Sequence, residues 1–380
     1  MLSGLVVALL LVGSAAALLA QEVALRFAAE MPRLDPAPET PGGPSGPRVG
    51  VVVAARNEET DLPALLDSLA VQEGGNLEVV VVDGGSVDRT RDVVRGRYPA
   101  VHLLEEPPLP EGWVGKNWAC WSGAQGVSGE WLLFLDADVR LHPSAIRTAL
   151  AWAQREGADL ASIAPRVEAV GFWERVVLPF YVQMVLTVFR APRTNRVGSR
   201  SAIANGQFWL VRRAEYERSG GHRAVREKIL EDVAIARRFR AAGRTLRFAW
   251  APQLAVTRMY RDRREMFEGI RKNVHGVDFS LLRQGGFLAA LVGLFWLPLG
   301  VLPLGVWAAS PVVAGVGLFL YVALFAKHVV LTRAVGAPSA YGLLYPLAVG
   351  FYVAVLASSI ARGVRRRPVT WKGRSYPLRP

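Results

Sequence analysis

Long runs without a charged residue lie at both ends of this 380-residue chain and constrain its architecture more than any other feature. The first covers Leu2 to Ala20, the longest covers Phe287 to Phe325 with three prolines inside it, and the last covers Tyr341 to Ile360. A helix that crosses a membrane needs about 20 apolar residues. The lengths therefore predict one N-terminal span, two spans in the longest run and one in the last run.

The N-terminal run has two interpretations. The small residues from Ser14 to Ala17 resemble a signal-peptide cleavage region, but no Lys or Arg precedes the run. We favour a retained anchor over residues 1–25 rather than a cleaved signal. Arg26 and Arg33 follow the run, so the positive-inside rule places the next part of the chain in the cytoplasm. Residues 26–47 include a stretch rich in Pro and Gly and are expected to form a semi-rigid linker.

The C-terminal tail, residues 362–380, contains seven Lys and Arg residues and no Asp or Glu. The positive-inside rule predicts that this tail is cytoplasmic. Three spans within residues 281–361 would instead carry it across the membrane from a cytoplasmic domain. Either one proline-broken segment is re-entrant or the tail is external, and we favour the cytoplasmic tail. The chain is thus expected to be a multi-pass protein of the cell (inner) membrane.

Composition excludes several classes of protein. A chain that is 51% hydrophobic and only 20% charged is not intrinsically disordered. A single cysteine excludes a disulfide framework and a Cys-rich zinc module. The net charge of +13 permits nucleic-acid binding, but a basic tail beside an apolar run is better explained by topology and anionic lipid. We therefore expect the bilayer, and no nucleic acid, as a partner.

The middle of the chain has the pattern of an α/β domain. Apolar strand-like runs at 48–55, 77–82 and 131–135 alternate with segments of helical spacing. Strands that alternate with helices predict a mostly parallel sheet. Polar residues follow each run, and the carboxyl ends of parallel strands lie at one edge, where ligands bind. These residues are Arg56, Asn57 and Glu58, then Asp83, Ser86 and Asp88, then Asp136 and Asp138.

The pair Asp136 and Asp138 suggests a metal site. Side chains two residues apart lie on the same side of an extended backbone. Two close carboxylates repel each other unless a cation lies between them, and Mg²⁺ or Mn²⁺ prefers such oxygens together with substrate phosphates. The alternative is an ordinary strand end with turn-forming aspartates.

Four segments together resemble a known family: VVVAARNEE, VVVDGGSVDRT, LFLDADVRLHP and LEDVAIARRFRAAG, in this order. They are similar to family 2 glycosyltransferases with the GT-A fold, over about residues 48–276. GWVGKNWAC, the C-terminal apolar runs and WKGRSY resemble the membrane-bound lipid glycosyltransferases, such as the ceramide glucosyltransferase-like, carotenoid-glycosylating and hopene-associated enzymes. The resemblance implies a Rossmann-like GT-A domain over 48–260, followed by an amphipathic interfacial helix over 261–280.

The resemblance also implies residue roles. Asp232 would be the general base, with Glu231 beside it. Asp138 and Asp136 would bind Mg²⁺ or Mn²⁺ and the donor diphosphate. The donor would be a UDP-sugar, with UDP-glucose favoured, and its pocket would be formed by Ala54, Arg56, Glu58, Asp83, Lys116, Asp136, Gln207 and Arg264.

Each of these roles has a purely structural alternative. Glu231 and Asp232 open a predicted helix and could serve only its dipole. Lys116 could be a solvated loop residue and Asp83 only a turn residue. The family often has two adjacent aspartates where this chain has Asp83 followed by Gly. We expect His222 to be structural and Cys120 to be a small buried hydrophobe.

The acceptor side is less constrained. Processive members of the family carry Q-x-x-R-W, whereas this chain keeps an R-x-x-R spacing, Arg261 to Arg264, without the Trp. This favours the addition of one sugar to a membrane lipid, at a hydroxyl or a carboxyl. The apolar stretch 172–189 is short for a confident span, and we expect it to lie in the interface near the acceptor, with core packing as the alternative. A polysaccharide synthase, a polyprenyl-phosphate sugar transferase and an inactive scaffold remain alternative functions.

Overall fold

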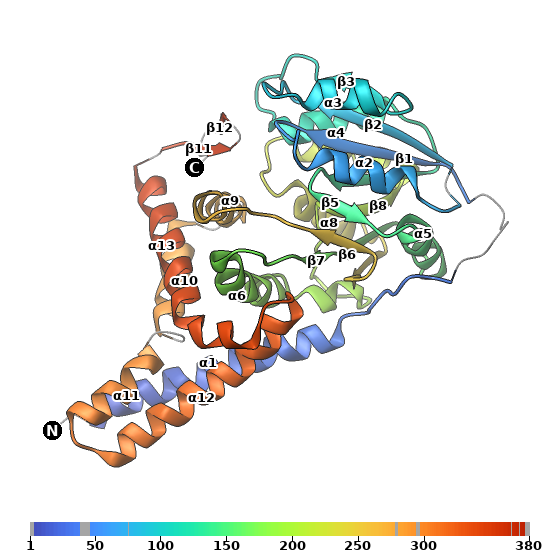
Figure 1. Cartoon of the computed structure of the whole chain (residues 1–380). Coiled ribbons are helices and arrows are strands. Elements are labelled where there is room, and N and C mark those ends of the chain that lie inside the picture. Colours follow the sequence, from blue (N-terminus) through green and yellow to red (C-terminus); the bar gives the residue numbers. More distant parts are fainter. Residues whose placement is uncertain are drawn as a thin grey trace.

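The structure, a computed structural model, describes residues 4–38, 46–74, 76–277, 280–293, 297–365, 367–371 and 373–376. An α/β domain occupies one end and a group of helices the other (Figure 1). The predicted linker residues 39–45 lie outside the described residues.

The main sheet has seven strands in the order β3-β2-β1-β4-β8-β6-β9. Their bounds are β1 Val49–Ala55, β2 Leu77–Asp83, β3 His102–Glu105, β4 Trp131–Asp136, β6 Leu160–Ala164, β8 Phe208–Arg212 and β9 Leu246–Trp250. β1 pairs in parallel with both β2 and β4, so Ala55 lies opposite Asp83 and Ala54 lies opposite Asp136. The predicted alignment of polar strand ends is therefore confirmed. β8 is the exception, because it runs antiparallel to β4 and β6.

Helices cover both faces of this sheet. The helices are α2 Leu62–Ala70, α3 Thr90–Arg97, α4 Gly115–Gln125, α5 Ala145–Arg155, α7 Arg213–Arg218 and α8 Glu231–Ala241, with the 3₁₀ turns η1 Ala191–Asn195 and η2 Gly221–Val225. Successive strand residues point to opposite faces. Val51 and Val53 pack with α2 and α5, whereas Val52 packs with α4 and α8. This two-sided burial accounts for the continuous apolar runs of the strands.

A small second sheet lies at the same edge. It has the order β5-β10-β7, formed by Val139–Leu141, Ala255–Thr257 and Arg166–Val167. Thr257 is paired with Val139, next to Asp138. The chain segment just after the metal-site candidate is thereby fixed to a strand more than a hundred residues later.

The helical part differs in detail from the predicted spans. It contains α1 Gly4–Glu30, α6 Phe172–Phe189, α9 Arg263–Gly276, α10 Leu281–Leu291, α11 Leu297–Trp307, α12 Pro311–Ala334, η4 Ser339–Leu344 and α13 Tyr345–Val364. Among the described residues, three helical segments are long and apolar enough to cross a membrane: α6, α12, and Ser339–Val364, which joins η4 to α13. The segment 172–189, expected to be short for a span, is thus among them.

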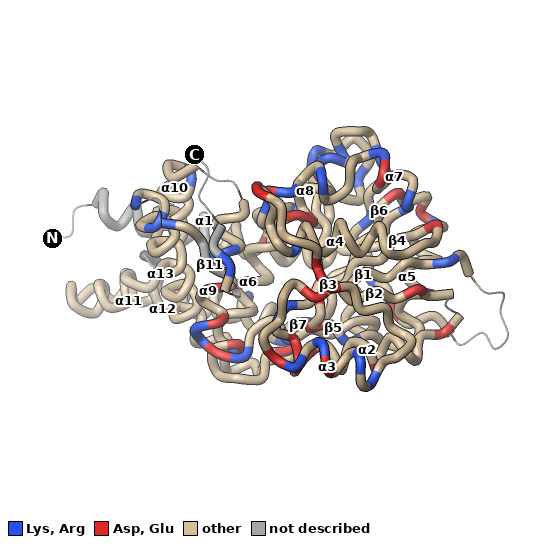
Figure 2. Tube along the Cα trace, turned by 90° about the horizontal axis from the view of Figure 1, so that it is seen from above, with Lys and Arg blue, Asp and Glu red and all other residues tan. Residues whose placement is uncertain are grey.

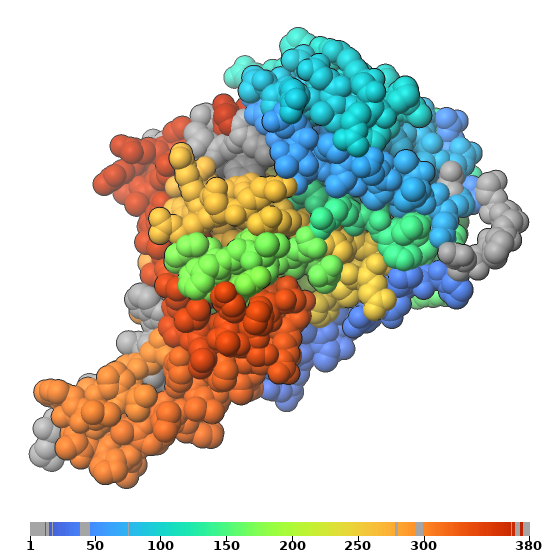
Figure 3. Space-filling model, viewed as in Figure 1, coloured from blue at the N-terminus to red at the C-terminus, as the bar shows by residue number. Residues whose placement is uncertain are grey.

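Within the described residues, the longest apolar run contains one long helix, α12, and parts of two shorter ones, α10 and α11. α10 and α11 have 11 residues each, and an 11-residue helix is only about 16 Å long at about 1.5 Å per residue. α11 folds back on α12, and the two helices project from the rest of the molecule (Figure 3). The backbones meet at Gly317, where a Cβ would lie 2.3 Å from the amide nitrogen of Leu302. Residues 294–296, between α10 and α11, lie outside the described residues, so of the two spans predicted in this run the structure describes one as a single long helix, α12.

The predicted boundary between the N-terminal anchor and the linker also shifts. α1 extends to Glu30, past the expected linker start at residue 26, and the chain then joins the sheet edge. Leu34 N donates to the Trp250 carbonyl (2.9 Å), and Trp250 N donates to the Pro32 carbonyl (2.8 Å). The N-terminal helix is thus tied directly to β9.

The C-terminal tail forms a hairpin, β11 Val369–Trp371 and β12 Arg374–Tyr376, which lies against the α/β domain. Figure 2 shows few coloured charges along α11, α12 and α13, whereas the α/β part carries both signs. The tail and the α/β domain therefore lie on one side of the apolar helices.

Candidate active site

A polar pocket lies at the carboxyl edge of the sheet. It is lined by residues that follow β1, β2 and β4, by the start of α4, by residues between β10 and α9, and by the tail. Of the predicted donor-site residues, it brings together Ala54, Arg56, Glu58, Lys116, Asp136 and Asp138. Five strand ends and turns thus meet where the parallel topology predicted a ligand site.

Lys116 lies in the first turn of α4 and joins two carboxylates. Its Nζ is 2.7 Å from Asp136 Oδ1 and 2.7 Å from Glu231 Oε1. Burial opposes its charge, but Asp136 and Glu231 hold the pKa of Lys116 well above its usual range. Lys116 is therefore a fixed cation in the site and not a solvated loop residue.

Three charged side chains converge on Gly206. A Cβ at this position would lie 2.9 Å from Lys116 Nζ, 3.3 Å from Asp232 Oδ2 and 3.5 Å from Asp136 Oδ2. The backbone N–H of Gly206 donates to Asp232 Oδ2 at 2.6 Å. Because β8 is antiparallel, the loop before it arrives at the same edge as the end of β4. A glycine at this point lets a carboxylate pair and a lysine approach each other closely.

Asp232 is half-buried at the start of α8, between the buried Glu231 and Val233. Burial and the neighbouring Glu231 raise the pKa of Asp232 to about 7, against the opposing charge of Lys116. A carboxylate with a pKa near neutral is suited to accept a proton during a reaction.

A chain of hydrogen bonds connects Asp138 to the β8 loop. Thr257 Oγ1 donates to Asp138 Oδ2 (3.0 Å), and Gln207 Nε2 lies 3.4 Å from Thr257 Oγ1. Asn205 Nδ2 in turn donates to Gln207 Oε1 at 3.0 Å. Gln207 therefore reaches Asp138 only through Thr257. It lines the apolar cavity described below, rather than the polar pocket.

The residues present fit a divalent metal. Asp136 and Asp138 both line the polar pocket, and carboxylate oxygens are the ligands that Mg²⁺ and Mn²⁺ prefer. Across the part of the chain that the structure describes, no group of three or more His, Cys, Asp and Glu residues is placed to hold a metal. A metal bound by two aspartates would complete its coordination with substrate phosphates and water, as Mg²⁺ commonly does.

Two predicted donor-site residues lie elsewhere. The Asp83 carboxylate is buried at the end of β2, where it accepts from Ser86 N (3.2 Å) and lies 3.6 Å from Arg91 Nε. Arg264 is exposed on α9 and pairs with Glu268 at 3.3 Å. Neither lines the polar pocket, which instead receives Arg261 from the same R-x-x-R segment.

The predictions that His222 is structural and that Cys120 is a small buried hydrophobe are confirmed. His222 Nδ1 lies 2.8 Å from Tyr216 Oη, and its ring packs near Phe134. Burial lowers the pKa of His222 to about 3. Cys120 is buried among the apolar residues beneath α4.

Sequence reasoning missed three basic residues that line the polar pocket: Arg258, Lys272 and Arg374. Arg374 belongs to the tail hairpin, forms an ion pair with the buried Glu106, and donates from Nη2 to the Gly84 carbonyl at 3.0 Å. A Cβ at Gly115 would lie 1.8 Å from Arg374 Nη1. Arg374 belongs to the motif WKGRSY, which could have drawn attention to it. The motif alone does not show that the tail folds back to the polar pocket.

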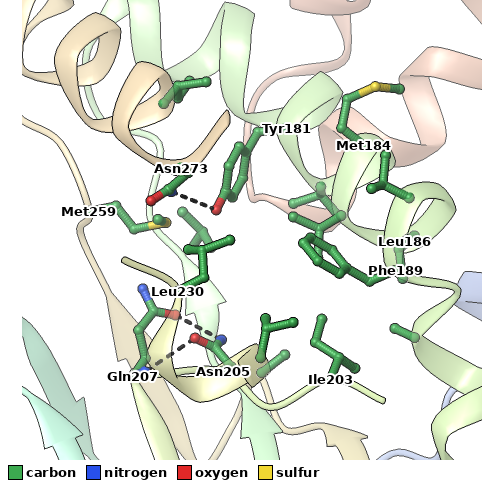
Figure 4. Close-up of a pocket in the computed structure, with 18 of the residues that line it drawn as sticks. Tyr181, Met184, Leu186, Phe189, Ile203, Asn205, Gln207, Leu230, Met259 and Asn273 are labelled. Carbon is green, nitrogen blue, oxygen red and sulfur yellow. Dashed lines mark hydrogen bonds between the residues drawn. The ribbon is translucent and has the colours of Figure 1, made fainter. Parts of the chain in front are cut away.

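An apolar cavity of about 240 Å³ lies on the other side of Asp232 (Figure 4). Its walls come from α6, α9, α10, the end of α12 and α13, from Met31 just after α1, and from the β8 loop and α8. Tyr181 of α6 lines the cavity, whereas its neighbour Phe180 packs in the helical core against Tyr352. Met259 lines both the cavity and the polar pocket, so the two spaces adjoin near Asp232.

Comparison with known proteins defines the class. Residues 50–220 match the family described as Glycosyl transferase family 2. A mannosyltransferase from Pyrobaculum calidifontis, in complex with GDP-Man and Mn²⁺, has a TM-score of 0.57 and 20% identity, covering 96% of this chain and 99% of that chain. This likeness shows the fold. Residues 50–220 thus match family 2 glycosyltransferases, as the sequence motifs predicted, and the chain shares the fold of the mannosyltransferase.

The curated relatives point to a narrower group. A 4,4'-diaponeurosporenoate glycosyltransferase from Staphylococcus haemolyticus is 28% identical over 193 residues, which are 50% of this chain and 51% of the relative. A protein of the same name from Staphylococcus aureus (strain USA300) is 26% identical over 343 residues, 86% of this chain and 88% of the relative. The chain thus resembles carotenoid-glycosylating enzymes.

Proposed function

We propose that this enzyme transfers one sugar from a nucleotide sugar, with UDP-glucose as the first candidate, to a membrane lipid. One observation supports the proposal most strongly: Asp232 lines the apolar cavity and converges on Gly206 with Lys116 and Asp136, which line the polar pocket. The polar pocket has the cations and carboxylates that a sugar diphosphate needs. The cavity has the apolar walls that a lipid needs, and a proton acceptor at its end.

The reaction follows from this arrangement as a single displacement. The acceptor oxygen attacks the anomeric carbon, and the bond from that carbon to the diphosphate breaks with its electron pair on the diphosphate. The proton of a hydroxyl acceptor passes to Asp232, whose pKa near 7 lets it accept at neutral pH. Lys116 stabilises the negative charge that develops on the leaving group. One displacement inverts the configuration of the anomeric carbon.

Asp136 and Asp138 are the residues that would hold the metal, and a bound divalent cation supplies further positive charge to the leaving diphosphate. Thr257 keeps the Asp138 carboxylate in one orientation through its hydroxyl. Arg374 adds a cation at the Gly84 side of the pocket, where it would face the donor nucleotide.

We also propose that the catalytic domain is cytoplasmic. Arg374 of the tail hairpin forms an ion pair with Glu106 of this domain, so this basic part of the tail lies on the same side as the site. The positive-inside rule assigns such a segment to the cytoplasm. An accessibility-labelling experiment on intact cells with a cysteine introduced at exposed Arg365 tests this, because external labelling contradicts it.

The test of function uses the purified full-length protein in detergent. UDP-glucose, UDP-galactose and GDP-mannose are supplied separately with total bacterial lipid and Mn²⁺, and the release of nucleoside diphosphate and the mass of the lipids are measured. We expect one donor to give metal-dependent release together with a lipid that has gained a hexose, and EDTA to abolish both. Nucleotide release without a glycosylated lipid, or no release from any donor, contradicts the proposal.

A further inference from the structure

The polar groups of the apolar cavity are few and gathered at one end. Of the described residues that line it, only Arg166 and Asp232 are charged, and Arg166 is 3.7 Å from Glu168. Tyr181 of α6 and Asn273 of α9 are joined by a hydrogen bond that points toward the cavity (Figure 4). The rest of the surface around the labelled aliphatic and aromatic side chains is apolar. The cavity therefore suits a long apolar body with one small polar end.

The hydrogen bonds already made define what that polar end can be. Asn273 Nδ2 donates to the Tyr181 oxygen at 3.5 Å, which leaves the phenolic hydrogen to donate to a ligand. The Asp232 oxygens accept from Gly206 N (2.6 Å) and Val233 N (2.7 Å), and each carboxylate oxygen has a further lone pair. The Asn205 and Gln207 amides bond to each other. Beside these amides, the cavity end thus offers the Tyr181 hydroxyl as a donor and the Asp232 carboxylate as an acceptor.

An alcohol matches this pair. Its O–H donates to Asp232 while its oxygen accepts from Tyr181, and both bonds hold the oxygen that must attack the sugar. A carboxylate could accept from Tyr181, but it would place a second negative charge beside Asp232 and Glu231 in a buried site. Like charges at close range in such a site repel strongly.

We propose that the cavity binds the hydrocarbon body of a neutral lipid alcohol, and that Tyr181, held by Asn273, positions its hydroxyl toward Asp232. This inference rests on the proposed function and narrows it, since that function admits either a hydroxyl or a carboxyl acceptor. It also distinguishes this chain from relatives that are named for a carboxylate, diaponeurosporenoate.

A binding experiment with two matched probes tests the choice of end group without any need for turnover. Retinol and retinoic acid share one polyene body and differ only in the terminal hydroxyl or carboxylate. Trp250 lines the cavity, so quenching of tryptophan fluorescence in the full-length protein in detergent reports binding. We expect retinol to bind at least tenfold more tightly than retinoic acid at pH 8. Equal or tighter binding of the acid, or no saturable binding of either probe, overturns the proposal.

Substitution of Tyr181 tests its role. Tyr181→Phe removes one oxygen and keeps the ring, and Tyr341→Phe is the control, because Tyr341 lies on η4 outside the cavity lining. We expect Tyr181→Phe to weaken retinol binding about tenfold and to lower kcat/KM for an alcohol acceptor, with the donor KM unchanged. Tyr341→Phe should match the wild type. A Tyr181→Phe protein with wild-type retinol affinity, or with an equal loss of donor affinity, overturns the positioning role.

The two proposals fail in different ways. If the enzyme transfers no sugar to lipid, the proposed function is wrong, and the wild type shows no metal-dependent donor turnover. If only the inference is wrong, donor turnover and lipid glycosylation persist, and the acid is the better ligand or Tyr181 makes no difference.

Discussion

The polar pocket and the apolar cavity share Asp232 as a neighbour but are built in opposite ways. The polar pocket is formed by polar residues that directly follow strands in the sequence. It contains ion-paired side chains such as Lys116 and Asp136. The cavity is formed mainly by helices α6, α9, α10 and α13, and its polar side chains are exceptions among apolar ones. A nucleotide sugar carries several charges, whereas a lipid carries almost none. Both can reach the same carboxylate only where a polar pocket adjoins an apolar cavity.

Asp232→Asn should produce the largest effect, because it removes the group at the boundary between the two spaces. Loss of a general base lowers the rate by about 10²- to 10⁴-fold. We expect lipid glycosylation to fall within this range while binding of the donor nucleotide, measured by calorimetry, is kept. Asp92→Asn, an exposed aspartate on α3, is the matched control. Retained turnover in Asp232→Asn would assign proton transfer to another group.

Gly206→Ala tests how tightly the two spaces adjoin. The added methyl would lie within 3.5 Å of Lys116, Asp232 and Asp136 and would push them apart. A small displacement of catalytic groups can cost about 10²-fold in rate. We expect kcat to fall by about this factor with folding preserved, as judged by thermal unfolding. Gly96→Ala on α3 has open space at its Cβ and should be silent, and a fully active Gly206→Ala would show that the site tolerates a wider separation.

The pH dependence tests the burial of Asp232 between the two spaces. Its pKa is raised to about 7, so the basic form is lost as the pH falls through that value. We expect kcat/KM to fall about tenfold for each pH unit below 7 and to level off above it. The folded protein also binds this proton more tightly than the unfolded chain, so ionisation costs folding free energy as the pH rises from about 4 to 7. Asp232→Asn should therefore raise the melting temperature more at pH 8 than at pH 5, and the reverse order would contradict the raised pKa.

Arg374→Ala should have the smallest effect and should be confined to the polar pocket. It removes the cation beside Gly84 and leaves Glu106 buried without that partner. We expect the KM for the donor to rise about tenfold, in line with the roughly 1.5 kcal/mol of a hydrogen bond to a charged group, with the acceptor KM unchanged. Arg365→Ala, an exposed arginine in the same tail, is the control. Equal changes in both KM values would show that the tail acts on the whole fold and not on the donor side.

The sequence predicted the parts of the site that depend on local pattern. The ends of β1, β2 and β4 align because three apolar runs, each with a polar residue after it, form parallel strands. Lys116 and Asp232 were predicted from a family resemblance, and the structure brings them together through Glu231 and Gly206.

The remaining parts depend on contacts that no local pattern encodes. Gly206 reaches Asp136 only because β8 is antiparallel, and Thr257 reaches Asp138 only because β10 pairs with β5. Asp83 and Arg264 were assigned to the donor, but Ser86 and Glu268 engage their side chains instead. The apolar cavity could not be predicted, because its walls join helices from α6 to α13 with Met31, which lies more than three hundred residues before Leu356.

The bond between Arg374 and Glu106 has a consequence for the order in which the molecule is completed. The α/β domain leaves the ribosome long before residue 374 is made, and chains emerge at about 5–20 residues per second. Until α13 has been inserted and the hairpin has returned to Gly84, the donor pocket lacks one of its cations. A nascent or truncated chain would thus contain a folded catalytic domain with a lower affinity for the nucleotide sugar. Only a protein whose membrane part is already in place would reach full donor affinity.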